Sequence, residues 1–167
     1  GGEMKAARKK LLQDMPVFGA IRGDTLEFLV DLAREVRVDS GDFFFQEDEE
    51  GASMFVLEKG EVAVIKNWHG EPQRLARLQA GDCFGEMSLL QCSPRSASIR
   101  ATADCVALEL TNATLLQLYE RDLEQFTIIQ MNVSREIARR LRRADERLFV
   151  SRMESPSAGG DYDFFVI

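Results

Sequence analysis

The chain has 167 residues and a formal net charge of −7 at pH 7. That length suits one domain, and the acidic balance argues against the chain as a whole binding nucleic acid. Cys83, Cys92 and Cys105 form no CxxC pair, so neither a disulfide framework nor a zinc ribbon is indicated. We also see no apolar run near the roughly 18 residues of a membrane span and no signal-peptide core. We therefore expect a cytoplasmic protein that makes no membrane contact.

The N-terminal part of the chain predicts two helices. Residues 3–12 form a short basic segment that ends before Pro16, because proline disfavours helix in the residue that precedes it. Residues 25–35 place apolar side chains on one face, and Asp24 is the expected N-cap. We assign residues 1–16 to an N-terminal helical segment that precedes the main domain.

After residue 35 the pattern changes to short β-rich runs separated by turn signals that contain glycine. Such runs, repeated about every 8 to 12 residues, are typical of a sandwich or barrel, and we predict a β jelly roll with flanking helices. The expected strands are residues 35–38, 43–46, 54–58, 61–67, 73–79, 96–101 and 105–110. An acidic segment, residues 39–50, lies among them.

The C-terminal part predicts a helix over residues 111–120 and a long one from about 122 to 150. Apolar residues recur along the long helix every three to four positions. They are Phe126, Ile129, Val133, Ile137, Leu141, Ala144 and Leu148. This stripe is longer than a small barrel can cover, so we expect its C-terminal part to form a parallel homodimer seam. The alternative is a helix folded onto its own barrel.

The main domain is expected to span residues 17–152, and residues 153–167 to form a linker with an apolar tail. Residues 155–160 have the composition of a linker, and residues 161–167 are unusually apolar. The tail could dock on a surface groove or on a partner, or be a simple chain end.

The loop over residues 81–100 carries the chemistry of an anion site. Gly85 opens a very short helical segment, residues 86–90, whose unpaired backbone N–H groups and dipole favour an anion. Arg95 supplies a planar cation that can bind two phosphate oxygens. Glu86 would repel phosphate, but it could accept hydrogen bonds from ribose hydroxyls while a cation such as Arg95 offsets its charge. Phosphate and ribose together indicate a nucleotide.

These residues also match a known family pattern. Phe84-Gly85-Glu86-Met87-Ser88-Leu89, followed by Pro94-Arg95-Ser96-Ala97, resembles the phosphate-binding cassette of the cyclic-nucleotide-binding domain. That family includes the bacterial catabolite activator protein, the regulatory subunits of protein kinase A and cyclic-nucleotide-gated channels. The resemblance covers roughly residues 17–152 and implies a double-stranded β-helix jelly roll.

The resemblance assigns a role to each cassette residue. It implies that Arg95 binds phosphate, together with backbone N–H groups around Gly85, Met87, Ser88 and Ala97, and that Glu86 accepts from the ribose 2′-hydroxyl. Phe84 flanks this cradle. A hydroxyl at Ser96 can bond a phosphate oxygen or a guanine amine, so it permits cGMP without requiring it, and we favour cAMP.

The long helix departs from the family pattern at the base contact. Ile137-Ala-Arg-Arg-Leu141 resembles the long helix of the catabolite activator, but Ala144 and Asp145 replace the hydroxyl pair that contacts adenine there. Asp145 or Arg142 could reach the base instead. The alternative is that both are solvent-facing charges.

We expect a binding module and no enzyme. His69 is the only histidine, which leaves too few ligands for a metal-dependent jelly-roll enzyme, and the Gly-Lys-Ser/Thr of a P-loop is missing. After Arg152 too few residues remain for a helix-turn-helix domain, which argues against DNA binding by this chain. By resemblance, ligand shifts the long helix over the pocket through Leu89 and so signals to an effector protein. The rival function is a ligand-independent dimerisation or protein-interaction domain with the same fold.

Overall fold

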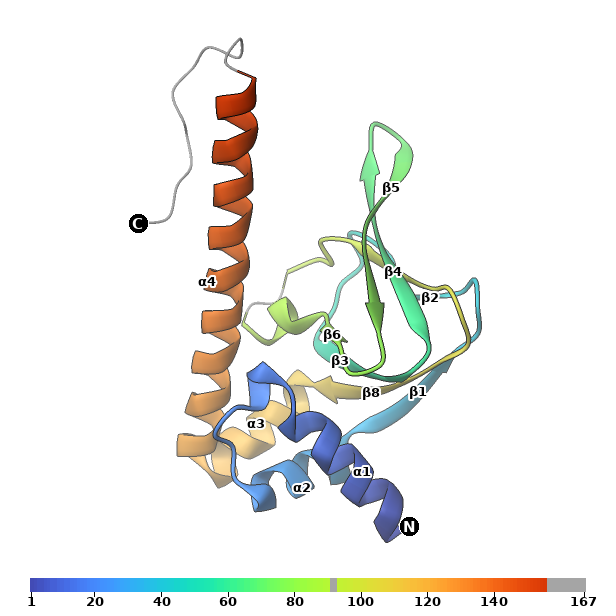
Figure 1. Ribbon diagram of the computed structural model, residues 1–167. Coiled ribbons are helices and arrows are strands. Elements are labelled where there is room, and N and C mark those ends of the chain that lie inside the picture. Colours follow the sequence, from blue (N-terminus) through green and yellow to red (C-terminus); the bar gives the residue numbers. More distant parts are fainter. Residues whose placement is uncertain (91–92, 156–167) are drawn as a thin grey trace.

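The computed structural model describes residues 1–90 and 93–155, and it is built from two antiparallel sheets of four strands each. One sheet has the order β1-β8-β3-β6 and the other β2-β7-β4-β5. Helices α1, α2 and α3 gather at one end of the barrel, and α4 runs along one side of it (Figure 1). The elements are α1 Gly2–Gln13, η1 Pro16–Phe18, α2 Gly23–Leu32, β1 Arg34–Val38, β2 Phe43–Phe45, β3 Ser53–Lys59, β4 Glu61–Trp68, β5 Glu71–Gln79, β6 Cys83–Phe84, η2 Glu86–Leu89, β7 Ser98–Ala101, β8 Cys105–Thr111, α3 Asn112–Arg121 and α4 Leu123–Glu154. The predicted jelly roll with flanking helices is confirmed.

An aromatic cluster fills the space between the sheets. Phe45, Phe55 and Phe84 are buried there, and the rings of Phe55 and Phe84 stack with centroids 5.3 Å apart. Phe84 belongs to β6, a strand of two residues that pairs with β3 and was not predicted, because two residues are too short to show a period. This pairing fixes the chain just before η2.

A second apolar core joins the helices to the barrel and anchors the first half of α4. Ile129 and Val133 of α4 are fully buried in it. Polar bonds add to the anchoring: the backbone N–H of Arg22 donates to Gln125 Oε1 at 2.9 Å, and Asn132 Nδ2 donates to the carbonyl of Gly19 at 2.8 Å. The N-terminal half of α4 is therefore fixed to the loop around η1.

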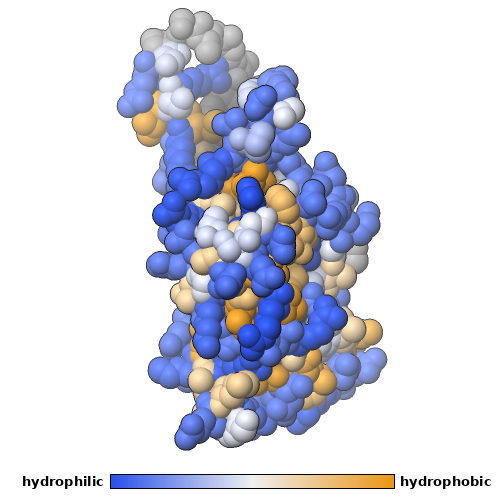
Figure 2. All heavy atoms as spheres, turned by 90° about the vertical axis from the view of Figure 1, so that its right-hand side faces the viewer, coloured by the Kyte–Doolittle hydropathy of each residue, from blue (hydrophilic) through white to orange (hydrophobic). Residues whose placement is uncertain are grey.

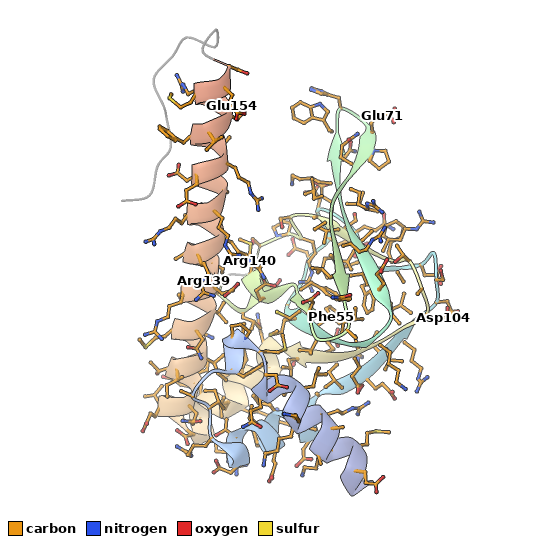
Figure 3. The ribbon with its side chains drawn as sticks, in the orientation of Figure 1. Phe55, Glu71, Asp104, Arg139, Arg140 and Glu154 are labelled. Carbon is orange, nitrogen blue, oxygen red and sulfur yellow. The ribbon has the colours of Figure 1, made fainter. Side chains whose placement is uncertain are left out.

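The second half of α4 extends beyond the barrel. Leu141 is 41% exposed and Leu148 is 54% exposed, although both continue the apolar stripe that is buried lower down. Figure 3 shows Glu154, at the end of α4, and Glu71, at the tip of the β4–β5 hairpin, at the same end of the molecule. The predicted stripe thus packs on its own barrel in its first half only.

The strand-bearing face turned away from α4 is largely hydrophilic, with smaller apolar areas between the polar side chains (Figure 2). Within the residues described, no helix has both the length and the apolar character needed to cross a membrane.

One local prediction was wrong. Helix α2 begins at Gly23, and Arg22 occupies its N-cap position, so Asp24 lies in the first turn rather than at the cap. There its carboxylate accepts from the N–H of Thr25 at 3.0 Å, where the helix dipole favours an acid. The tail predicted over residues 161–167 lies outside the described residues.

Candidate functional site

The loop between β6 and β7 is shaped by Gly85. Its φ of +80° is a left-handed conformation that glycine adopts at little cost. A Cβ at this position would also lie 2.7 Å from Arg95 Nη1 and 3.0 Å from the carbonyl oxygen of Ser53. Glycine is therefore required both by the turn into η2 and by the space that Arg95 occupies.

Arg95 is a buried cation with incomplete hydrogen bonding. It is 7% exposed, its Nη1 donates to Ser88 Oγ at 2.9 Å, and its guanidinium lies over the ring of Phe45 at 4.0 Å from the centroid. Among the described residues its Nε has no hydrogen-bond partner. Burial lowers the pKa of Arg95, opposed by the negative charges of Glu109 and Glu49, and a guanidinium still stays protonated in proteins.

The acidic segment holds Arg95 in place through its backbone. The N–H of Asp48 donates to the carbonyl of Arg95, and the N–H of Arg95 donates to the carbonyl of Glu49, both at 2.8 Å. A Cβ on Gly51 would lie 2.1 Å from Arg95 Nε. The acidic segment therefore fixes the main chain of Arg95, and Gly51, which follows this segment, leaves room for the side chain.

Glu86 is paired with α4. It is only 3% exposed, and its Oε1 accepts from Nη1 of Arg140, which projects from α4 toward the segment that carries η2 (Figure 3). Arg140 also lies 3.8 Å from Glu136, one turn earlier on the helix. The sequence predicts that a cation such as Arg95 offsets the charge of Glu86. In the structure that cation is Arg140, whereas Arg95 faces Ser88 and Phe45.

These groups surround one cavity of about 390 Å³, within the usual size range of small-molecule sites. Arg95, Gly85 and Glu86 form a polar end, and the neighbouring strands supply an apolar wall. Burial raises the pKa of the Cys83 thiol to about 11, so this cysteine is a neutral apolar filler. The lining residues are Phe45, Val64, Ala76, Leu78, Cys83, Phe84, Gly85, Glu86, Met87, Ser88, Ser93, Pro94, Arg95, Ser96, Ala97, Ile99 and Arg140.

The cavity brings together the predicted cassette residues except Leu89, which is buried in the core that joins the helices to the barrel. Arg142 and Asp145 are not among its lining residues in the part of the chain described; Arg142 is exposed and Asp145 is half-buried, both farther along α4. Arg140 was missed, because the sequence gives no means of choosing among several arginines on one long helix. The apolar wall from β4 and β5 was missed too, since it requires the strand register.

The fold and the site define a ligand-binding module of the jelly-roll type, and comparison with known proteins identifies its family. Residues 35–122 match the family model described as the cyclic nucleotide-binding domain. This match covers more than half of the chain, so the chain belongs to the cyclic nucleotide-binding domain family. It is a regulatory domain of the type found in catabolite activator proteins and in protein kinase A regulatory subunits.

The chain matches only part of the length of two curated relatives. It is 34% identical over 101 residues to human cGMP-dependent protein kinase 2, which is 59% of this chain and 13% of the kinase. It is 29% identical over 138 residues to the cyclic AMP receptor protein of Thermus thermophilus, which is 82% of this chain and 62% of the relative. The chain thus spans a small part of the first relative and less than two thirds of the second.

Solved structures give the same fold. The Thermus thermophilus catabolite activator protein superposes with a TM-score of 0.74 at 28% identity, over 84% of this chain and 64% of that one. A cyclic nucleotide-binding domain from Methylobacillus flagellatus superposes with a TM-score of 0.77 over 96% of this chain and 87% of that one. Its identity of 21% supports the fold alone.

Proposed function

We propose that this domain binds a cyclic nucleotide, with cAMP favoured over cGMP, and signals through α4. The observation that carries the proposal is the buried guanidinium of Arg95 at the polar end of the cavity. A buried charge is normally paired with an opposite one. No carboxylate of the described residues forms a salt bridge with Arg95, so an anionic phosphate is the partner that would complete its hydrogen bonding.

The remaining parts of the nucleotide follow from the position of the phosphate. Glu86 would accept from the ribose 2′-hydroxyl, and the apolar wall of Val64, Ala76 and Leu78 suits the flat face of a base. The hydroxyl of Ser96 also lines the cavity and permits a guanine contact. Relatives include proteins named for each nucleotide. We favour cAMP because the side chains of the apolar wall offer no hydrogen-bonding groups to the polar edge of guanine.

Arg140 places a side chain of α4 in the cavity, where a bound ligand can contact it. Because the Arg140 guanidinium already occupies Glu86, a ribose hydroxyl must share or replace that contact. The ligand therefore changes the free energy of one α4 contact, which is the condition for shifting a population between two helix positions. We propose that α4 then moves over the cavity. Arg142 and Asp145 remain candidate base contacts in that second position.

The exposed half of α4 is proposed to pair with a second copy of the chain. Leu141 and Leu148 continue the buried stripe but are largely exposed. A parallel pair of helices would cover them through heptad-like packing. The signal would then pass from a homodimer to a further module or an effector protein.

The test is calorimetric titration of nucleotide-free protein with cAMP and with cGMP in one buffer. We expect saturable binding of both, tighter for cAMP. Tighter binding of cGMP would reverse the preference and keep the site. An absence of heat with both, in protein shown by absorbance to carry no nucleotide, would favour the ligand-independent dimerisation or interaction domain.

A further inference from the structure

Lys66 on β4 holds the end of the cassette from outside the cavity. Its Nζ donates to the carbonyl oxygen of Ser96 at 2.6 Å and to Glu47 Oε1 at 3.1 Å. Ser96 lines the cavity, whereas Lys66 lies against a different surface groove, beside Trp68. Lys66 therefore reaches the cassette backbone without being in a position to touch a molecule in the cavity.

Glu47 orients this lysine and links two strands, β4 and β7. Its Oε2 accepts from the N–H of Asn67 at 2.9 Å, while its own N–H donates to Ser98 Oγ at 2.8 Å. Both of its carboxylate oxygens are thus occupied on the β4 side, and its backbone is bonded at the start of β7. Hydrogen bonds from Asn67 and Lys66 lower the pKa of Glu47, which keeps it charged near neutral pH. The ammonium of Lys66, whose side chain is 49% exposed, is thus bonded to both Glu47 and the carbonyl of Ser96.

The consequence for the cassette follows from peptide geometry. The peptide between Ser96 and Ala97 is planar and trans, so the Ser96 carbonyl and the Ala97 N–H point in opposite directions. With the carbonyl held toward Lys66, the N–H points away from Lys66. Ala97 lines the cavity, and within residues 1–90 and 93–155 its N–H makes no backbone hydrogen bond outside the sheet ladders.

We propose that Lys66, oriented by Glu47, is a positioning residue that turns the Ala97 N–H into the cavity as a donor to a phosphate oxygen. The inference rests on the proposed binding of a cyclic nucleotide. It also gives the acidic segment a function, because Glu47 acts there through its side chain and the next two residues act through their backbone on Arg95. The Lys66–Glu47 pair is neutral overall, so its effect on the ligand is orientation of a donor rather than long-range attraction.

The first test is Lys66→Met, which keeps the length of the side chain and removes its charge and donors. We expect cAMP affinity, measured by calorimetry, to fall about 5- to 20-fold, as for a weakened hydrogen bond to a charged group. Lys66→Arg keeps a donor and should restore most of the affinity. Lys10→Met is the matched control, since Lys10 is 76% exposed on α1 and lies far along the chain from the cassette. The thermal unfolding of each variant shows that the fold is retained.

A second readout separates positioning from a general structural effect. Two phosphorothioate analogues of cAMP carry sulfur, a poor acceptor, in place of one or the other exocyclic phosphate oxygen. In the unmodified protein, we expect the analogue that lacks the oxygen facing Ala97 to bind more weakly than the other analogue. In Lys66→Met, this additional loss of affinity should become smaller, by about the same factor as the variant's loss of affinity for cAMP. The affinity loss of the other analogue relative to cAMP should be the same in both proteins.

Each outcome has a distinct meaning. If the unmodified protein binds cAMP and Lys66→Met binds it equally well, the inference is overturned and the proposed function stands. The inference is also overturned if each analogue loses the same affinity relative to cAMP in the parent protein and in Lys66→Met. Lys66 would then support the structure in general and would not orient the Ala97 N–H. If the unmodified protein binds no cyclic nucleotide, the proposed function fails and this inference fails with it.

Discussion

Two arginines face the same cavity from two different walls. Arg95 comes from the barrel: it is 7% exposed, packs on Phe45 and is bonded through its backbone to the acidic segment on both sides. Arg140 comes from α4, and its side chain is half exposed. Its partner Glu86 belongs to η2, on the barrel side of the cavity. The barrel wall is built in place before any ligand arrives, whereas the helix wall is held by a contact that a ligand can change.

Under the proposed function, this difference divides affinity and signalling between separate parts of the site. A preorganised group such as Arg95 contributes binding free energy without the cost of ordering it. A group that loses its first partner on binding contributes less affinity, but it links the ligand to the position of the helix. Glu86 connects the two walls, because it lies on η2 and forms an ion pair with Arg140 of α4. The comparison predicts that substitutions on the barrel wall will change affinity most.

The largest effect is expected for Arg95→Ala. It removes the buried cation, and loss of a charged hydrogen-bonding partner costs about 1.5 to 3 kcal/mol, or roughly 10- to 150-fold in affinity. Calorimetry with cAMP measures the loss. Because this arginine forms no salt bridge that the structure describes, the melting temperature should stay within a few degrees of the parent value. Undiminished binding by a folded variant would refute the assignment of the phosphate site.

A smaller but still clear loss is expected for Gly51→Ala. The new Cβ would overlap the Arg95 guanidinium, which is the flexible end of a side chain, so it moves aside and the fold persists. We expect cAMP affinity to fall about tenfold, as for a displaced hydrogen-bond donor. The control is the double variant with Arg95→Ala. Since both changes act through one guanidinium, their effects should not add, and full additivity would count against this explanation.

On the helix wall, Arg140→Ala should lower affinity by only about 3- to 5-fold. Its charge attracts the anionic ligand, but a half-exposed side chain is screened by water. The matched control is Arg139→Ala, because Arg139 is similarly exposed, pairs with Glu136 at 2.7 Å and does not line the cavity in the described part of the chain. Equal losses in both variants would show that the helix charge acts only at long range.

The cassette side of the barrel wall was predictable from sequence, whereas the apolar side from β4 and β5 and the helix wall were not. Gly85, Glu86 and Arg95 stand close together in the chain, so a local motif fixes both their identity and their relative positions. The partner of Glu86 is far away in sequence, and which of several arginines on α4 meets it depends on the rotation of a helix that is docked through Ile129 and Val133. Lys66 and Gly51 matter through contacts of their own with the 95–98 segment, which no periodicity reveals.

The smallest effect on ligand affinity is expected from the far half of α4. Replacing both Leu141 and Leu148 with serine removes exposed apolar side chains from the proposed seam, so the dimer should dissociate while the affinity for cAMP changes less than about twofold. Light scattering measures the mass, and calorimetry the affinity. Met131→Ser is the control, because Met131 is an exposed apolar residue of the anchored half, outside the stripe. A parent protein that stays monomeric at high concentration would remove the seam from this picture, and α4 would then have to signal from a single chain.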